Sequence, residues 1–339
     1  MKFGPVPLSE AEGAILAHSV ALNDGRLRKG RVLDAADLAV LEAAGHDCLT
    51  VARLDPTDQH EDAAALALAQ ALVPEPEVMG LELRPVGTGR VNIVATGAGL
   101  VQLRPADIHA VNCVDAAITV ATLPELMRVE PGAMVATVKI IPYGVADTAI
   151  ERACAVAGAG LRILPPVIRR ASLVQTWVGT PDDGTKGHRV TAARLHRLGV
   201  ILDRPCVVTH QIAPLAEALR AASGEVVLIL TGSATSDLQD TAPEALRAAG
   251  GEIIHFGMPV DPGNLLFLGQ LGARCVIGLP GCAKSPALNG ADWVIERVIC
   301  GLHVTAKEIM SMGVGGLLKE IPSRPRPRRQ GEPAAWRAD

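Results

Sequence analysis

Val226-Val227-Leu228-Ile229-Leu230, followed directly by Thr231-Gly232-Ser233-Ala234-Thr235-Ser236-Asp237, is the stretch that decides the fold. Five apolar residues in succession are typical of a parallel strand that is buried on both faces. The small and hydroxyl-bearing residues after it predict a loop that leads into a helix. Sheets of this kind bind ligands where strands end and helices begin. The stretch therefore predicts an α/β sheet with a ligand site at the end of a strand.

Two later segments repeat the pattern of an apolar run followed by turn residues. One is Phe256-Gly257-Met258-Pro259-Val260-Asp261-Pro262-Gly263-Asn264, and the other is Val276-Ile277-Gly278-Leu279-Pro280-Gly281-Cys282-Ala283-Lys284-Ser285. Together the three loops carry little bulk and many N–H and hydroxyl donors. Such loops suit a phosphorylated ligand.

Strand and helix patterns alternate over residues 167–321, which predicts a doubly wound α/β domain. The expected strands are 172–178, 200–202, 226–230, 252–256 and 275–278, and the expected helices are 188–198, 213–222, 240–249 and 290–300. Residues 265–269, ahead of Gly272, predict a β-hairpin before the third loop.

The rest of the chain divides into three further parts. Residues 1–75 predict a small α+β unit with helices at 9–16, 34–44 and 61–72. Residues 76–166 predict a β-rich unit with strands at 91–95, 99–103, 117–121 and 134–141 and a helix at 145–158. Residues 322–339 are rich in proline and arginine, which predicts an extended tail.

Composition excludes several classes of function. The net charge is −4 with scattered basic residues, and aromatic residues make up 2% of the chain, so we expect no nucleic-acid binding. No apolar run approaches the ~20 residues of a membrane helix, so no membrane association is expected. Seven cysteines without a CxxC pair, and no signal peptide at the start, predict reduced thiols and a cytoplasmic location.

The three loops resemble those of a known family in order and spacing. Residues 231–240 resemble the T-G-G-x-S-x-G-x-x-D loop of molybdopterin-binding domains. Asp261-Pro262-Gly263-Asn264 stands where the molybdenum-insertion enzyme has K-P-G-K, and residues 278–285 resemble its G-L-P-G-N-P-x-S. The family is that of molybdopterin molybdenumtransferase, its adenylyltransferase relatives and gephyrin, and the chain resembles bacterial molybdopterin-binding proteins most. Residues 1–75 resemble the start of the insertion enzyme more weakly.

This resemblance implies an αβα sandwich with a mostly parallel sheet, preceded by smaller mixed α+β units. It also implies a set of site residues. Asp237 and Asp240 would be catalytic and would hold Mg²⁺. The cofactor would be bound by Thr231, Gly232, Ser233, Thr235, Ser236, Pro262, Gly263, Asn264, Pro280, Gly281, Cys282, Lys284 and Ser285, together with Asp182 and Lys186 from a long loop that closes over the site.

Plain structural interpretations stay open beside these roles. Asp240 is equally well placed to cap the helix after it. Cys282 has the size of a small core residue, and Lys284 could be a solvated surface lysine. Two lysines of the insertion enzyme are replaced here by Asp261 and Asn264, which removes positive charge from a site that would meet phosphate and molybdate.

Three functions are therefore expected to compete. The first is molybdenum-cofactor biosynthesis, with molybdopterin or adenylyl-molybdopterin as ligand and molybdate as substrate. The second is a non-catalytic carrier or scaffold for the cofactor. The third is a nucleotide hydrolase of the competence-damage type, which uses the same domain. The resemblance also implies a homodimer and a molybdoenzyme or nucleotidyltransferase partner.

Overall fold

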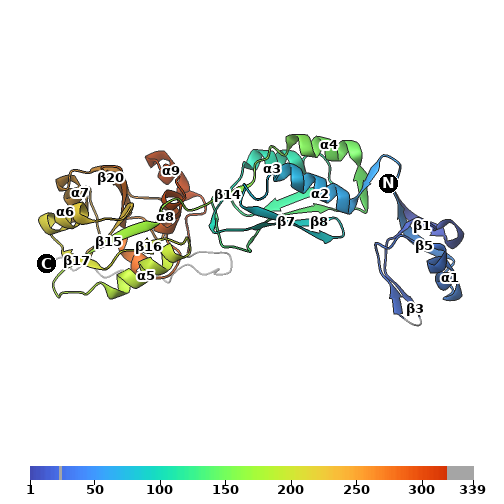
Figure 1. Ribbon diagram of the computed structural model, residues 1–339, viewed down its shortest axis with the longest axis horizontal. Helices are drawn as coiled ribbons and strands as arrows, with labels where there is room; N and C mark the ends of the chain where they lie inside the picture. The colour runs from blue at the N-terminus through green and yellow to red at the C-terminus, as the bar shows by residue number, and fades with distance from the viewer. Residues whose placement is uncertain (23–24, 319–339) are drawn as a thin grey trace, which may run out of the picture. The chain divides into compact units, whose positions relative to one another are not determined.

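The computed structural model describes residues 1–22 and 25–318. Contacts between Cα atoms divide the chain into two compact units, Met1–Pro165 and Pro166–Asp339 (Figure 1). The tail predicted at 322–339 lies outside the described residues. No helix among the described residues is long and apolar enough to cross a membrane.

The second unit is built on one seven-stranded sheet. Its strands lie in the order β16 (Ile201–Leu202), β15 (Arg170–Trp177), β18 (Val226–Leu230), β21 (Arg274–Leu279), β20 (Phe267–Leu271) and β19 (Glu252–Phe256), and β17 (Cys206–Thr209) also pairs with β15. Strands β16, β17, β15, β18 and β21 run parallel to one another. Strand β20 runs antiparallel to both β21 and β19.

Helices cover both faces of this sheet. On one face α6 (Ile212–Ala221) and α7 (Thr241–Ala248) pack on alternate strand residues such as Val174, Val227 and Ile229. On the other face lies α5 (Thr185–His196), in which a Cβ added to Gly187 would meet Leu230 Cδ2 at 2.8 Å. An ion pair joins α5 to α8 (Gly290–Ile299), so α8 lies on that face too. The predicted αβα sandwich with a mostly parallel sheet is confirmed.

Strand β18 is central because its sequence can be buried on both faces. All five of its residues are at most 1% exposed. Beside it, Gly278 in β21 leaves room for a large neighbour, since a Cβ there would overlap the ring of Phe267. The fully buried ring of Phe267 thus packs against a glycine. The β20–β21 hairpin is confirmed, with Gly272 at its turn and β20 beginning at Phe267 rather than at residue 265.

The edge of the sheet beyond β15 is interrupted. Strand β16 pairs with Arg170 and Ala171, and β17 pairs with Val174 to Trp177. Residues 203–205 separate these two short strands. Three short segments complete the described part of this unit, η2 (Gly281–Lys284), α9 (Ala306–Met310) and η3 (Ser311–Gly313).

The first unit begins with a small sheet in the order β1 (Lys2–Pro7), β5 (Cys48–Arg53) and β2 (Ile15–Leu16), followed by the hairpin of β3 (Val20–Leu22) and β4 (Gly25–Leu27). The helix predicted at 9–16 is wrong. Only one 3-10 turn forms, η1 (Leu8–Glu10), because Gly13 takes a left-handed conformation (φ +73°) and Ile15 pairs with Ala52 as a strand. Helix α1 (Ala35–Ala43) forms as predicted, with Asp34 and Asp37 as a capping box.

The remainder of the first unit has helices on one face of a sheet (Figure 1). The sheet order is β10 (Ile118–Thr122), β12 (Met134–Ile140), β8 (Arg90–Ala95) and β7 (Leu81–Gly87). A second sheet contains β11 (Arg128–Val129), β9 (Gly99–Gln102) and β14 (Arg162–Leu164), and β6 (Asp58–His60) pairs with β13 (Gly144–Ala146). The helices are α2 (Glu61–Leu72), α3 (Pro105–Asn112) and α4 (Asp147–Val156).

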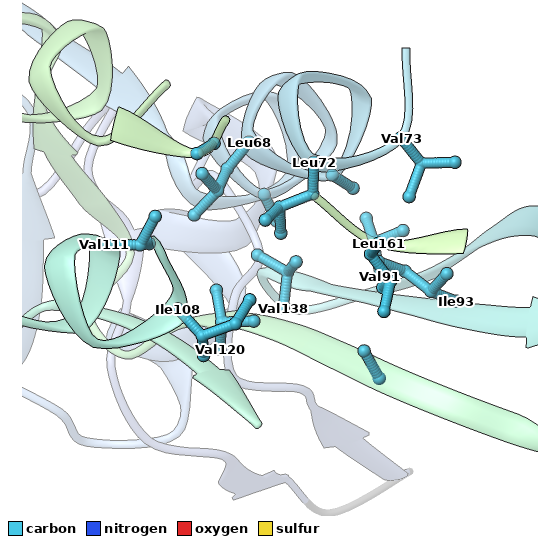
Figure 2. Packing of buried hydrophobic residues seen from close by; sticks show 14 of the residues in the cluster. Leu68, Leu72, Val73, Val91, Ile93, Ile108, Val111, Val120, Val138 and Leu161 are labelled. Carbon is cyan, nitrogen blue, oxygen red and sulfur yellow. The ribbon is translucent and has the colours of Figure 1, made fainter. Parts of the chain in front are cut away.

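Helix α2 packs on β8 and β12. Figure 2 shows Leu68 and Leu72 of this helix facing Val91 and Val138 of the two strands, and all four side chains are at most 1% exposed. Residues 61–72 therefore share their core with the strands at 90–95 and 134–140. Strand β7 and helix α3 were not predicted from the sequence.

Candidate functional site

The three loops singled out in the sequence leave the same edge of the second unit's sheet. Gln175, Leu230 and Leu279 lie side by side near the carboxyl ends of three parallel strands. Strand β19 ends at Phe256, which pairs with Phe267, and Phe267 in turn pairs with Gly278. This carboxyl edge therefore carries the first loop (231–240), the second loop (257–266), the third loop (280–289) and the β15–α5 loop (178–184).

The first loop is anchored to β15 at its start. The Gly232 N–H donates to Thr176 Oγ1 at 2.9 Å, and a Cβ on Gly232 would lie 2.8 Å from the Thr176 carbonyl oxygen. Thr231 and Thr235 are each 4% exposed, with their hydroxyl oxygens 3.5 Å apart. The two threonines therefore shape the loop from inside, rather than presenting their hydroxyls at the surface.

The middle of the first loop is where unpaired donors lie. Ser233 and Ala234 are exposed, and no described residue accepts a hydrogen bond from their N–H groups. The Ser236 N–H donates to Asp240, and its hydroxyl lies 3.4 Å from the Ala234 carbonyl oxygen. The loop can thus offer two backbone N–H groups and the Ser233 hydroxyl to an anion.

Asp240 is the N-cap of α7. Its Oδ1 accepts from Thr241 N at 2.6 Å and its Oδ2 accepts from Ser236 N at 3.0 Å, so the capping role is observed. Asp237 Oδ1 accepts from Gln239 N at 2.7 Å. Within residues 1–22 and 25–318, no group of three or more His, Cys, Asp or Glu side chains is placed to hold a metal. A catalytic or Mg²⁺-binding role for the two aspartates stays a prediction.

In the second loop, Pro262 and Gly263 are buried against the start of α8. The Gly290 N–H donates to the Pro262 carbonyl at 2.8 Å, and a Cβ on Gly263 (φ +150°) would lie 3.0 Å from Gly290 Cα. The Asp261–Pro262 peptide bond is cis. Asn264 is exposed, and its Nδ2 donates to the Met258 carbonyl at 3.3 Å. Of the predicted ligand residues in this loop, Asn264 alone is exposed.

The third loop presents several of its predicted residues at the surface. Gly281, Cys282 and Ser285 are exposed, Lys284 is half-buried and Pro280 is buried. Asn289, which is 1% exposed, donates from Nδ2 to Cys282 Sγ at 3.0 Å and so fixes the position of this thiol. Lys284 forms no ion pair with any described residue, which leaves its positive charge available at the carboxyl edge.

Arg194 of α5 holds the third loop in place, a role that no sequence pattern indicates. Its guanidinium donates to the carbonyl oxygens of Ala283 (2.7 Å), Ser285 (2.6 Å) and Ala287 (3.1 Å). Nothing in the local pattern distinguishes Arg194 from its exposed neighbours on the helix. The feature that marks it, three converging carbonyls from a loop about 90 residues later, exists only in the folded chain.

His210 is a second residue at the carboxyl edge that the sequence did not single out. It follows β17, and its Nδ1 lies 2.8 Å from Thr176 Oγ1, the same hydroxyl oxygen that accepts from the Gly232 N–H. Its side chain is half-buried. Its position after a strand of the sheet is the signal that could have placed it beside the first loop.

The β15–α5 loop brings fewer of its predicted residues into contact with the others. Asp182 Oδ1 accepts from Gly184 N at 2.9 Å, and Lys186 is exposed in the first turn of α5. Asp183 accepts from Thr185 N, and this hydrogen bond lowers the pKa of the Asp183 carboxyl. His188 Nε2 bonds to the Asp203 carbonyl at 2.8 Å. The loop therefore borders the carboxyl edge, and a ligand-binding role for Asp182 and Lys186 stays a prediction.

Four cavities, of about 160 to 780 Å³, are lined by residues outside the three loops. Two of them lie along the interrupted edge of the sheet. One is lined by Arg170 and Asp203, and the other by Ala192 and Ile201. A ligand at the carboxyl edge would be held by exposed donors on its surface.

Comparisons with known proteins leave the family of this chain open. A family described as a domain of unknown function (DUF8806) matches residues 5–53. No curated protein matches the chain.

Similar solved structures include the molybdopterin biosynthesis MoeA protein from Pyrococcus horikosii, with 12% identity over 88% of this chain and 75% of that chain and a TM-score of 0.30. They also include the molybdopterin biosynthesis Mog protein from Mycobacterium ulcerans (17% identity, 38% of this chain, 92% of that chain, TM-score 0.26). A third is the CinA protein from Thermoplasma acidophilum (17% identity, 34% of this chain, 90% of that chain, TM-score 0.23). Because these scores are low, the fold assigned to the second unit rests on its strand order and its two helical layers.

Proposed function

We propose that this protein binds molybdopterin, or its adenylylated form, at the carboxyl edge of the second unit's sheet. The single observation that carries the proposal is that three sequence segments with the family's order and spacing leave one edge of one sheet. Ligands of α/β sheets bind at this edge.

The donors at the edge favour an anionic ligand. The unpaired N–H groups of Ser233 and Ala234 and the Ser233 hydroxyl are directional donors, and Lys284 supplies a positive charge without an acidic partner among the described residues. Backbone N–H groups together with a cation are a common arrangement for phosphate. The terminal phosphate of the pterin would lie between the first and third loops.

A binding role is supported better than molybdate insertion. Asp261 and Asn264 stand where the resemblance implies two lysines, and both oxygens of Asp240 already accept backbone hydrogen bonds. Fewer positive charges would meet molybdate, so we place cofactor binding and transfer first and assistance in molybdate insertion second. Mg²⁺, held by Asp237 and Asp240 with phosphate oxygens, belongs to that second function.

Isothermal titration of the full chain with molybdopterin, with and without molybdate and Mg²⁺, tests this proposal. We expect saturable binding without molybdate, and a loss of roughly tenfold in affinity in the Lys284→Ala variant. Lys307→Ala, an exposed lysine in α9, is the matched control and should bind as the unaltered chain does.

Two outcomes would contradict the proposal. If no pterin binds but AMP is released from a dinucleotide in the presence of metal, the protein is a hydrolase. If Lys284→Ala and Lys307→Ala bind equally and Ser233 substitutions have no effect, the ligand lies elsewhere. A homodimer, implied by the same resemblance, is tested separately by sedimentation.

A further inference from the structure

A groove in the first unit lies beside strand β7 and far from the three loops in sequence. Its volume is about 780 Å³. Its apolar lining comes from Val78, Leu81 and Leu83, and Val78 is 82% exposed. We refer to this hollow as the β7 groove. Without a partner, the Val78 side chain is exposed to water. A valine or isoleucine side chain of a partner could be buried against it.

The β7 groove borders a free strand edge. Strand β7 is the last in its sheet and pairs with β8 alone among the described strands. The Thr96 N–H donates to the Gly80 carbonyl. Because main-chain groups alternate in direction along an antiparallel strand, the N–H and C=O groups of the even-numbered residues of β7 point toward β8. The main-chain groups of Leu83 and Pro85 point away from β8. Pro85 therefore lies where no N–H is needed for pairing within the sheet. The Leu83 N–H and C=O and the Pro85 C=O are left for another strand.

The rim of the β7 groove is acidic. Glu75, Glu77 and Glu82 line it, and Arg84 pairs with Glu82 at 2.7 Å. The hydrogen bond from Arg84 lowers the pKa of Glu82. Glu75 and Glu77 are exposed and form no ion pair with any described residue. The groove thus carries uncompensated negative charge around an apolar centre.

We propose that the β7 groove binds an extended basic segment of a partner protein, which adds as a strand to the free edge of β7. Strand addition supplies main-chain hydrogen bonds, and alternate side chains of the added segment reach the same side. Apolar side chains of the segment would contact Val78 and Leu83, and lysine or arginine side chains would face Glu75 and Glu77. The inference is independent of the function proposed for the second unit.

The test uses the full chain and an eight-residue peptide in which valine and lysine alternate. In low salt we expect saturable binding, with NMR shift changes confined to residues 75–83 and 96. Amide exchange of Leu83 should slow in the complex, because its N–H gains an acceptor. The amides of Glu82 and Arg84 should exchange as before, since they already face β8.

Charge and apolar contributions are separated by variants. Glu75→Gln combined with Glu77→Gln should weaken binding roughly tenfold at low salt. Glu151→Gln, which changes an exposed glutamate of α4 outside the groove, should have no effect. Val78→Ser should weaken binding at any salt concentration, because the apolar contact is not screened by ions.

Three results would overturn the proposal. A peptide in which valine alternates with glutamate must not bind, and equal binding of the two peptides would remove the charge argument. Equal affinity of the double variant and the Glu151→Gln variant would place the site elsewhere. Unchanged exchange at Leu83 in a saturated complex would exclude strand addition.

Discussion

Arg194 and Asp292 form a buried ion pair between α5 and α8, with Arg194 Nε 2.6 Å from Asp292 Oδ1 and both side chains at most 8% exposed. Three further bonds, one from Nη1 and two from Nη2 of Arg194, go to carbonyl oxygens of the third loop. Asp292 Oδ2 accepts from Asn289 N at 2.8 Å, at the other end of the same loop. One ion pair therefore fixes both the packing of two helices and the path of the third loop.

We predict that Arg194→Ala lowers the free energy of unfolding by about 3–5 kcal/mol, since it leaves the Asp292 charge buried and three carbonyls without a donor. Arg194→Lys should be intermediate, because an ammonium group cannot reproduce the planar fork of donors. Urea unfolding measures both. Arg189→Ala, an exposed position on the same helix, should change stability by less than about 0.5 kcal/mol. A comparable loss in both alanine variants would show that helix propensity, and not the ion pair, is responsible.

Substitutions of Asp240 distinguish its role as the N-cap of α7 from the predicted role as a metal ligand. Asp240→Ala should destabilise the second unit by about 1 kcal/mol through loss of the N-cap, and Asp240→Asn should cost only a few tenths because asparagine also caps. Urea unfolding without metal gives these values. Addition of Mg²⁺ with molybdopterin should then separate the two roles. If Asn restores stability but not metal-dependent binding, Asp240 is a metal ligand as well as a cap.

Gly281 is predicted to matter for the ligand and not for folding. Its Cβ position has no heavy atom within 4 Å, so Gly281→Ala should leave the unfolding free energy within about 0.5 kcal/mol of the unaltered chain. If the pterin approaches the backbone there, its affinity should fall by about tenfold or more, as measured by calorimetry. Gly97→Ala, whose Cβ position is equally open, is the matched control. Unchanged affinity for the Gly281 variant would place the ligand away from the third loop.

Asp203 should contribute a pH-dependent part of the stability. Burial raises its pKa, but hydrogen bonds from Ser172 and Arg170 outweigh this, and the pKa of Asp203 lies below its ordinary value. A lowered pKa stabilises the folded state above the unfolded pKa of about 3.9, and the contribution is lost as the pH falls towards the folded value. Asp203→Asn should therefore cost roughly 1–2 kcal/mol at pH 7.

The difference between Asp203→Asn and the unaltered chain should shrink as the pH is lowered below about 4. Urea unfolding across this range measures it. Glu217→Gln, an exposed change on α6, should show no such trend. A difference that stays constant from pH 7 to pH 3 would mean that the carboxylate charge of Asp203 is not what stabilises the fold.

Much of the second unit could be predicted because its signals are local. The apolar runs 226–230 and 252–256 coincide with β18 and β19, and the hydroxyl-rich loop after β18 lies where the alternation of strand and helix places it. The first unit was harder. Ser9 and Glu12 have the spacing of a capping box, but Gly13 and the pairing of Ile15 with β5 decide the structure instead. The helix propensity of this short segment was outweighed by strand pairing with β5, which lies more than 30 residues later in the chain.

The site was predicted in part for the same reason. Loop residues such as Ser233 and Gly281 are placed by the strands that precede them, and those strands could be read from the sequence. Arg194 and His210 act on loops that are distant in the chain, so no local pattern reveals them. The sequence also could not show that Pro262 and Gly263 would be buried, because that depends on the close approach of Gly290.

The break between β16 and β17 has a consequence for solubility. A continuous neighbour along the eight residues of β15 would itself have become a long outer strand with a full row of unsatisfied main-chain groups. Instead the sheet ends there in pieces of two and four residues, with Pro205 between them. Short outer strands offer another chain few main-chain groups to pair with, so we expect this edge to resist edge-to-edge aggregation better than the continuous outer strand β7 would.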